Sequence, residues 1–432
     1  MSDDAGPKVS VRAHEDAAAA PRAGRETTPR RTTGPGRRWT GGRLIWAWVL
    51  TRLLMLVICF APGYPLSSTM SDAVLYHEWG PALADGRFPD DDVRWQYPPL
   101  AAVPILLPRF LGGMYGITFM LCALAADFAI LYLLRRADRS PAGAWCWIAG
   151  IFLLGPTCLF RFDLFVTVPV VAALLWLGRH RLFGVLMAVG ALMKAWPVAL
   201  ALALRRDRTM IRVAAACAAT GALVAGAVTI AGDGAWGFLR SQRDRGAQIE
   251  AVAATPINVA RWFGWDGQVR YRYGSWELVG PGVDAALAAS FVITLAGLAL
   301  LAVPVLRRDP REWTPAAGAD AVLAGVLVLV VGGRVLSPQY LIWVLGVAAA
   351  CLATAGTRQR PAAALVLVAA ALTHLDFPIL WVALLKEGGF PPIAVLTLRN
   401  VLLVVATVLA VRAVWRRPRE GAPRQGAAAV RR

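Results

Sequence analysis

The chain has 432 residues, of which 57% are hydrophobic and only 17% are charged. A soluble domain averages about 45–50% apolar and about 25% charged residues, and here the apolar residues form long blocks such as 44–60 and 401–411. These features exclude an ordinary soluble enzyme, a disordered chain and an outer-membrane barrel, whose strands are short and alternating. The composition predicts an all-α polytopic transmembrane helical bundle.

The formal net charge of +18 lies mostly at the chain ends. Residues 1–43 carry nine Lys and Arg against five Asp and Glu, and residues 412–432 carry seven Arg against one Glu. Residues 61–96 carry six acids and two Arg. This alternation follows the positive-inside rule. It predicts a multi-pass plasma-membrane protein with both termini cytoplasmic, and it does not point to nucleic acid as a partner.

Two disordered basic cytoplasmic tails, 1–43 and 416–432, are expected around one transmembrane domain, 44–415. A span needs roughly 20 residues to cross a hydrocarbon core of about 30 Å, and about 11–13 membrane segments fit the sequence by this measure. The predicted segments are 44–60, 114–134, 143–160, 164–178, 182–204, 211–231, 285–306, 319–333, 338–355, 361–377 and 393–414.

Two segments are irregular. Residues 97–112 contain four prolines, too many for a regular spanning helix, so they predict an interfacial or re-entrant element. Residues 182–204 carry Lys194 at their centre and Arg on both flanks. Two half-helices that meet near Lys194 would keep both basic flanks on the inner side. With this hairpin, the loops 61–113 and 232–284 face outward.

The first outer loop carries a candidate catalytic carboxylate, Asp72. Asp72, Tyr76 and Trp79 are spaced i, i+4, i+7 and so share one face of a short helix. A carboxylate at position 72 is suited to accept a proton from a sugar hydroxyl, and the alternative is an N-cap that begins the helix. Trp79 and Tyr97 suit sugar contacts or interfacial anchoring equally well.

Several motifs on the predicted outer side, taken in their order along the chain, resemble those of the GT-C membrane glycosyltransferases. They are an acid after the first span, Tyr-Pro-Pro-Leu at 97–100, Arg-Phe-Asp at 161–163, Ala-Leu-Met-Lys-Ala-Trp-Pro at 191–197, Arg-Gly-Ala-Gln-Ile-Glu at 245–250 and Ser-Pro-Gln-Tyr-Leu-Ile-Trp at 337–343. The chain is similar over about residues 44–410 to glycosyltransferase family 87, of the actinobacterial type that uses polyprenol-phosphate-mannose. The resemblance implies a hexosyltransferase of the cell envelope with a polyprenyl-phosphate sugar donor, mannose being favoured. It also implies an inverting transfer to an outer glycolipid or polysaccharide acceptor, with Asp72 as general base.

A departing phosphate needs cations or oriented N–H groups. Candidates on the outer side are Lys194, Arg245, Arg334 and Arg161. Lys194 lies in an apolar stretch, where an ionisable group is costly unless it faces a cavity. Snorkelling to the interface is the alternative for Lys194, Arg161 and Arg334, and a solvated loop face is the alternative for Arg245.

Asp163 is the second outer carboxylate, and the resemblance places it near the acceptor or a metal. A contact with Arg161 that merely tethers the end of the span is the alternative. The candidates for acceptor or sugar contacts are Asp163, Tyr76, Trp79, Tyr97, Gln339, Tyr340 and His374. No tightly bound metal or other cofactor is expected, because no metal-ligand spacing occurs and the six Cys form no CxxC pair. A loosely bound divalent cation between Asp72 and Asp163 stays open.

Two charged residues are predicted to lie deep in the membrane. Arg52 follows Arg43 by nine residues and Asp127 precedes Arg135 by eight, which puts both roughly 12–13 Å into the bilayer at 1.5 Å per residue. Lone charges at that depth are unfavourable. We therefore expect a buried ion pair.

Two other functions compete with the enzyme. In a transporter or flippase, Lys194 and its broken segment would form a substrate site near the midplane. A structural or assembly protein would explain the hydrophobicity alone. The sequence shows no second interrupted segment in the other half of the chain, and its polar residues gather on one face, so the enzyme is favoured.

Overall fold

The computed structural model describes residues 35–416, apart from 138–139, 233, 242–244 and 387. Residues from Arg43 onward form one compact unit. The predicted tails therefore lie largely outside the described residues. Helix α1 (Pro35–Cys59) begins nine residues before the predicted span, and the disordered tail stays a prediction. Proline is well suited to the first position of a helix, because its missing N–H would be unpaired there anyway.

The all-α polytopic fold is confirmed. Within the described residues, six helical stretches are long and apolar enough to cross a membrane, and six shorter apolar helices accompany them. The six long helices are α1, α5 (Tyr115–Arg136), α9 (Thr209–Ala231), α12 (Val283–Arg307), α15 (Arg360–His374) continued by η7 (Leu375–Ile379), and α17 (Phe390–Trp415). The shorter ones are α4 (Ala102–Leu111) with η1 (Pro99–Ala101), α6 (Ala142–Leu154), α7 (Asp163–Leu175), α8 (His180–Met193), α13 (Pro315–Val331) and α14 (Tyr340–Ala353).

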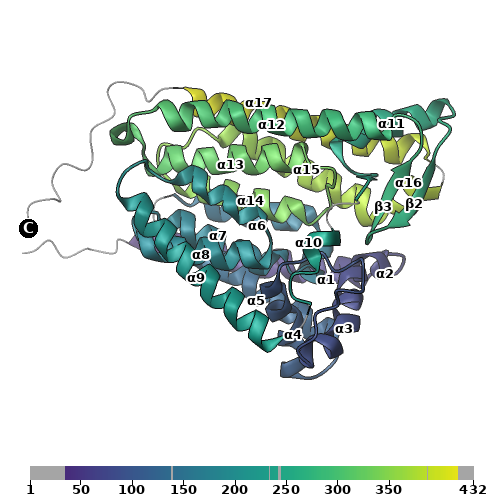
Figure 1. Ribbon diagram of the computed structural model, residues 1–432, viewed down its shortest axis with the longest axis horizontal. Helices are drawn as coiled ribbons and strands as arrows, with labels where there is room; N and C mark the ends of the chain where they lie inside the picture. Colours follow the sequence, from purple (N-terminus) through teal and green to yellow (C-terminus); the bar gives the residue numbers. More distant parts are fainter. Residues whose placement is uncertain (1–34, 138–139, 233, 242–244, 387, 417–432) are drawn as a thin grey trace, which may run out of the picture. The chain divides into compact units, whose positions relative to one another are not determined.

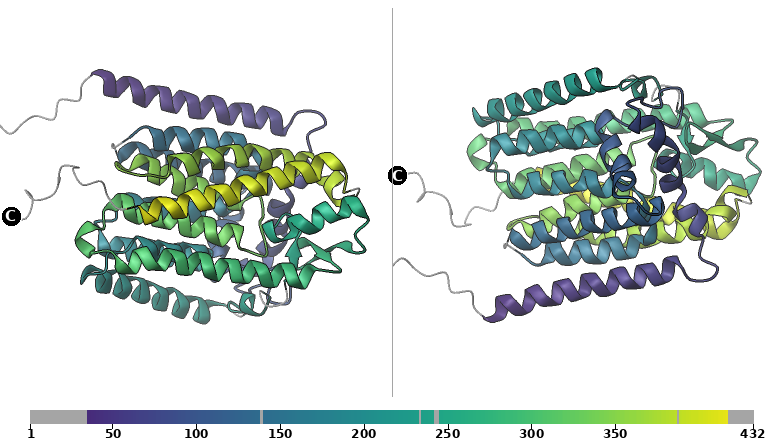
Figure 2. Two further views of the ribbon diagram at one scale, coloured as in Figure 1. Left: turned by 90° about the horizontal axis from the view of Figure 1, so that it is seen from above. Right: turned by 90° about the horizontal axis from the view of Figure 1, so that it is seen from below.

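The apolar helices of this unit run alongside one another (Figures 1 and 2). Helices α13 and α14 are buried along almost their whole length, as expected of helices that are apolar all round. Small residues bring the central helices together: a Cβ on Gly143 of α6 would come within 2.3 Å of the Ala349 carbonyl of α14. Close approach at small residues is the usual packing of membrane helices.

Shorter elements gather at one end of the bundle (Figure 1). They include α2 (Leu66–Thr69), α3 (Ser71–Ala84), α11 (Thr255–Ala260) and α16 (Trp381–Lys386), with α10 (Phe238–Ser241) close by. The 3₁₀ segments of the chain besides η1 are η2 (Pro156–Phe160), η3 (Trp196–Ala203), η4 (Val252–Ala254), η5 (Arg261–Phe263) and η6 (Pro310–Glu312). This end carries the side chains that the sequence marked as candidates in the two outer loops.

The second outer loop contains a small antiparallel sheet that the sequence analysis did not predict. Its strands β1 (Ala247–Gln248), β2 (Gln268–Arg272) and β3 (Ser275–Val279) are ordered β1-β3-β2. Tyr273 and Gly274 form the two-residue turn between β2 and β3, both with positive φ. Such turns match the natural twist of a hairpin. The strands are too short to alter the fold class.

The predicted hairpin at 182–204 is present. Helix α8 ends at Met193, Lys194 is extended, and η3 follows. A Cβ on Gly184, near the start of α8, would meet Val213 and Ala216, near the start of α9. Because the starts of α8 and α9 are neighbours, η3 must return the chain to the end of the bundle where α8 began.

A second interruption, at 375–379, was missed. Helix α15 runs into the π-turn η7 (Leu375–Ile379), in which Phe377 has extended backbone angles, and α16 follows. The absence of a second broken segment therefore no longer argues against a transporter.

The predicted pair between Arg52 and Asp127 is confirmed. Arg52 Nε lies 2.8 Å from Asp127 Oδ2, and its Nη2 lies 2.9 Å from Oδ1. The indoles of Trp48 and Trp147 also donate to this carboxylate, at 2.6 and 2.8 Å. The buried anion thus has one cation and two further donors.

Candidate active site

The carboxylate of Asp72 stands in the first turn of α3. Met70 occupies the N-cap position, so the alternative of Asp72 as the N-cap is wrong. The Asp72 side chain is 23% exposed, and the Arg161 side chain that faces it is 3% exposed. Arg161 Nε lies 3.1 Å from Asp72 Oδ2. A buried cation therefore anchors a carboxylate that remains partly accessible.

Two more side chains reach the same oxygen. The Tyr76 hydroxyl and the Gln339 amide Nε2 each lie 3.4 Å from Asp72 Oδ2. Tyr76 is one turn further along α3, as its spacing predicted, whereas Gln339 comes from the segment before α14. In the part of the chain that the structure describes, no side chain donates to Asp72 Oδ1. The two oxygens of Asp72 therefore differ in their side-chain partners.

Arg161 ties the end of η2 to the junction between α2 and α3. Its Nη1 donates to the Thr69 carbonyl at 3.2 Å, and its Nη2 donates to Ser71 Oγ at 3.3 Å. The expected alternative, a contact between Arg161 and Asp163, is wrong for the described residues, where the carboxylate that pairs with Arg161 is Asp72. Its charge is therefore paired with Asp72, and binding of the donor phosphate by Arg161 stays a prediction.

Asp163 pairs with Lys194. Lys194 Nζ lies 2.7 Å from Asp163 Oδ1, and the Trp343 indole N–H donates to the same oxygen. Asp163 is fully buried and Lys194 is 12% exposed. The break between α8 and η3 brings the ammonium group to Asp163. Lys194 has extended backbone angles at this break, so its side chain does not follow the direction of the α8 side chains. Lys194 therefore faces protein groups and does not snorkel to the interface.

Four aromatic rings surround the Lys194 ammonium. The ring centroids of Phe162 and Trp343 lie 4.8 Å from Nζ, that of Tyr340 lies at 5.4 Å, and that of Tyr97 lies at 5.6 Å. Cation–π attraction operates within about 6 Å of a ring centroid. The cage thus surrounds an ammonium group that already pairs with Asp163 at 2.7 Å.

Arg245 and Arg334 approach the same region from the second outer loop and the loop before α14. Arg245 Nη2 donates to the Tyr273 carbonyl at 3.3 Å, and Arg334 Nη1 donates to the Arg245 carbonyl at 2.8 Å. Burial raises the pKa of Tyr97, as do the charges of Asp72 and Asp163, while Arg245 lowers it. Arg245 is thus electrostatically part of the cluster, and Arg334 positions its backbone.

Trp79 and His374 have other partners. The Trp79 indole is buried and donates to Asp92 at 2.9 Å, which makes it a packing residue of the first outer loop. His374 Nε2 lies 3.1 Å from the Tyr64 hydroxyl, and its ring occupies the space that a Cβ on Gly155 would need. Within the described residues, neither ring forms a hydrogen bond with Asp72 or Asp163.

The sequence analysis missed three side chains of this site: Trp343, Phe162 and Gln248. Trp343 and Phe162 lay inside quoted motifs, and the stack of Trp343 on Tyr340, with centroids 3.9 Å apart, is an i, i+3 pair that spacing could have revealed. Gln248 accepts from the Leu336 N–H at 2.7 Å, and its own N–H donates to the Arg334 carbonyl. It holds the loop that presents Gln339.

The donor set of the site does not favour a metal ion. Asp72 and Asp163 each already have a cationic partner, Arg161 and Lys194. The described residues contain no group of three or more His, Cys, Asp or Glu that could hold a metal. The loosely bound divalent ion between the two carboxylates stays an untested prediction.

The sequence profile of glycosyltransferase family 87 matches residues 95–332, more than half of the chain. The chain belongs to glycosyltransferase family 87. No curated protein and no solved structure matches it. The matched interval contains Tyr97, Arg161, Asp163, Lys194 and Arg245. It ends before Gln339 and begins after Asp72.

Family membership together with the apolar helices makes this family 87 protein a multi-pass membrane glycosyltransferase. Its substrates are therefore a sugar donor and an acceptor. Asp163, Lys194 and Arg161 lie in segments that the family profile covers, whereas Asp72 on α3 and Gln339 in the loop before α14 lie outside it. This cluster is the candidate active site.

Proposed function

We propose that the protein transfers a hexose, with mannose favoured by the sequence resemblance, from a polyprenyl-phosphate donor to an extracytoplasmic glycolipid or glycan. The transfer inverts the anomeric carbon, and Asp72 is the general base. The observation that carries this proposal is the asymmetry of Asp72. Its Oδ2 is held by Arg161, Tyr76 and Gln339, whereas Oδ1 has no donor among the described residues.

Such a carboxylate is suited to general-base catalysis, which needs a group within hydrogen-bond reach of the proton that it removes. Oδ1 accepts the proton from the acceptor hydroxyl as the oxygen attacks the anomeric carbon. The bond between that carbon and the phosphate oxygen breaks on the opposite side, and polyprenyl phosphate leaves with the bonding electrons. Arg161 keeps the carboxylate oriented throughout.

The leaving phosphate gains negative charge, which pre-positioned cations stabilise. Lys194 is suited to this role, because Asp163 accepts from only one of its three N–H groups and the surrounding rings are not conventional acceptors for the other two. Arg245, whose buried Nε has no hydrogen-bond partner, is the second candidate. Tyr97 and Tyr340 offer ring faces and hydroxyls for the sugar. On this proposal the site lies on the outer side and both termini are cytoplasmic.

The test is a transfer assay with purified protein in lipid, polyprenyl-phosphate-linked labelled mannose and an acceptor extract. Asp72→Asn keeps the shape of the side chain and removes the base, and a general base contributes about 10²–10⁴-fold to the rate. Asp85→Asn is the matched control, since Asp85 lies in the same loop, 66% exposed, and pairs with Arg87.

We expect transfer by the wild type and Asp85→Asn, and a loss of at least a hundredfold in Asp72→Asn at equal yield and thermal stability. Equal transfer by all three proteins would show that Asp72 is not the general base, while the glycosyltransferase activity itself would stand. If none transfers mannose while another lipid-linked sugar is transferred, the assignment of mannose is wrong.

A further inference from the structure

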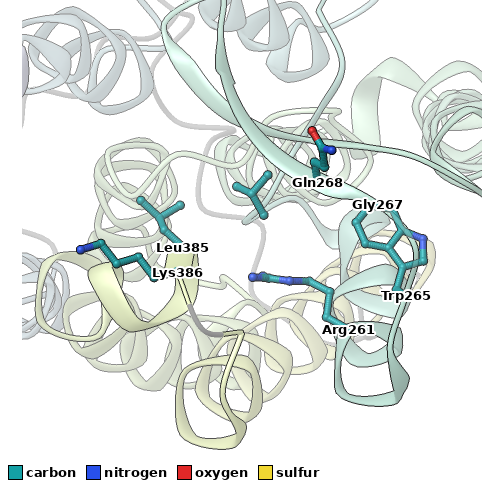
Figure 3. A pocket seen from close by; sticks show the side chains of 7 residues that line it. Arg261, Trp265, Gly267, Gln268, Leu385 and Lys386 are labelled. Carbon is teal, nitrogen blue, oxygen red and sulfur yellow. The ribbon is translucent and has the colours of Figure 1, made fainter.

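A separate hollow lies at the membrane-proximal edge of the second outer loop. It encloses about 510 Å³ and is lined by Arg261, Trp265, Gly267, Gln268, Val269, Leu385 and Lys386 (Figure 3). Gln268 begins β2, and the carbonyl of Tyr273, just past the end of this strand, accepts from Arg245 of the candidate active site. Five residues of strand span about 17 Å. The hollow is therefore distinct from the site around Asp72.

The Arg261 guanidinium is held in place by neutral groups. Its Nη1 donates to Asn258 Oδ1 at 3.2 Å and its Nη2 to the Leu384 carbonyl at 3.0 Å. A Cβ on Gly388, whose φ is +55°, would come within 2.9 Å of Nη2, so the glycine leaves room for the guanidinium against this backbone. Burial lowers the pKa of Arg261. No carboxylate among the described lining residues offsets its charge.

The Trp265 ring is fixed in a similar way. Its N–H donates to the Pro281 carbonyl at 2.9 Å. Positions 267 and 280 are both glycines, and a Cβ at either would collide with the ring, at 2.2 Å and 2.9 Å. Lys386, from α16, supplies a second cation that is exposed and has no partner in the part of the chain that the structure describes. Among the described residues, the hollow thus presents two basic side chains, Arg261 and Lys386, and an aromatic wall that a hydrogen bond holds in place.

The depth of the hollow identifies the kind of ligand. Lys386 precedes by four residues Phe390, the first residue of the candidate span α17. Trp262, the neighbour of Arg261, stacks on Phe390 with ring centroids 5.0 Å apart. Phe390 is 69% exposed and Phe263 is 83% exposed. A Trp at the end of a spanning helix is typical of the membrane interface, and Trp262 lies there against the first residue of α17; this is the level of lipid phosphates.

We propose that this hollow binds the phosphate headgroup of an anionic membrane lipid. Arg261 and Lys386 contact the phosphate, Trp265 and Gln268 contact the headgroup, and the acyl chains run beside Phe263, Phe390 and the surface of α17. Arg and Lys side chains are the usual partners of phosphate groups in proteins. This inference does not depend on the proposed catalytic role of Asp72.

The test measures binding of phosphatidylglycerol to the purified full chain in neutral detergent, by native mass spectrometry and by the shift in unfolding temperature. The variants are Arg261→Gln with Lys386→Gln, and Lys386→Gln alone, whose exposed side chain is not needed for folding. Arg87→Gln with Arg109→Gln is the matched control, because it removes two exposed positive charges from the first outer loop. Phosphatidylcholine and inorganic phosphate are the comparison ligands.

We expect the wild type and the control to bind phosphatidylglycerol in preference to phosphatidylcholine. Binding should weaken about fivefold in Lys386→Gln and about 30-fold in the double variant, since each basic side chain near an anionic lipid contributes roughly a factor of five. Unchanged binding in both variants would overturn the proposal, and so would equal binding of phosphatidylcholine. Displacement of the lipid by millimolar inorganic phosphate would show a site for free anions instead.

Discussion

Arg161 Nε lies 3.1 Å from Asp72 Oδ2, although Asp163 is only two residues from Arg161 in the chain. Asp163 pairs instead with Lys194, 31 residues further on. Each carboxylate of the candidate site therefore has its own cation. This crossed arrangement leaves one partly exposed acid, Asp72, and one fully buried acid, Asp163, which explains how two similar residues can have different roles.

The pairing of Asp163 with Lys194 makes a stability prediction. Lys194→Met leaves a fully buried carboxylate without its cation, and breaking a buried pair in this way costs about 3–5 kcal/mol. The double variant Lys194→Met with Asp163→Leu removes both charges, so it should recover much of this loss. Unfolding temperature in a single detergent measures both effects.

The same double variant tests the role of Lys194 in transfer. We expect it to be stable and inactive, since the donor phosphate has lost its cation. Full activity would contradict phosphate binding by Lys194, and a double variant as unstable as Lys194→Met alone would contradict the pairing as the source of the stability.

The surroundings of Asp127 predict that its ion pair cannot be reversed. Trp48 and Trp147 donate their N–H groups to the Asp127 carboxylate, and neither can accept from an arginine placed there. Arg52→Asp with Asp127→Arg should therefore give little folded protein, like either residue changed to Ala. The yield of monodisperse protein after size-exclusion chromatography measures this.

The exposed pair of Arg87 and Asp85 is the control for that experiment. Its atoms lie 3.3 Å apart with both side chains more than 60% exposed, and exposed pairs contribute little. Arg87→Asp with Asp85→Arg should fold like the wild type. A swapped Arg52 and Asp127 pair that also folds like the wild type would show that the two indole hydrogen bonds are dispensable.

Asp92 predicts how the stability of the first outer loop depends on pH. Burial raises the pKa of Asp92, but hydrogen bonds from Arg94 and Trp79 and the charge of Arg94 together outweigh it, so the pKa lies below its usual value of 3.8. A lowered pKa in the folded state stabilises the protein above the unfolded pKa, and this contribution is lost as the pH falls through the folded pKa.

The wild type should therefore unfold at a higher temperature than Asp92→Asn near neutral pH, and the difference should shrink as the pH falls below about 4. Unfolding temperatures between about pH 7 and pH 3 check this. Asp85→Asn, in the same loop, should show no such trend. A difference between wild type and Asp92→Asn that is constant over the range would mean that the carboxylate charge does not contribute.

The membrane-spanning architecture could be predicted because a long run of apolar residues identifies a segment that lies in the hydrocarbon core of the bilayer. Predicted segments such as 114–134 and 211–231 agree with helices α5 (Tyr115–Arg136) and α9 (Thr209–Ala231) to within two residues at each end. The break at Lys194 followed from basic residues on both flanks. The pairing of Arg52 with Asp127 followed from counting residues to the membrane boundary, since two opposite charges at equal depth have few other partners. The small sheet and the π-turn at 375–379 gave no comparable signal, because both are short and lie where the chain is already irregular.

The amino-acid sequence by itself determined the class of the protein, its spans and the set of polar residues at one end of the bundle. Only the tertiary structure decided which of them meet: Lys194 with Asp163 and the rings of Tyr97, Phe162 and Trp343, and Arg261 with Gly388 and Trp265. Hydropathy and spacing define how deep a residue lies and which face of its own helix it occupies. The partner across a helix interface depends on the rotation and neighbours of each helix, which are set by close packing of side chains from segments far apart in the chain.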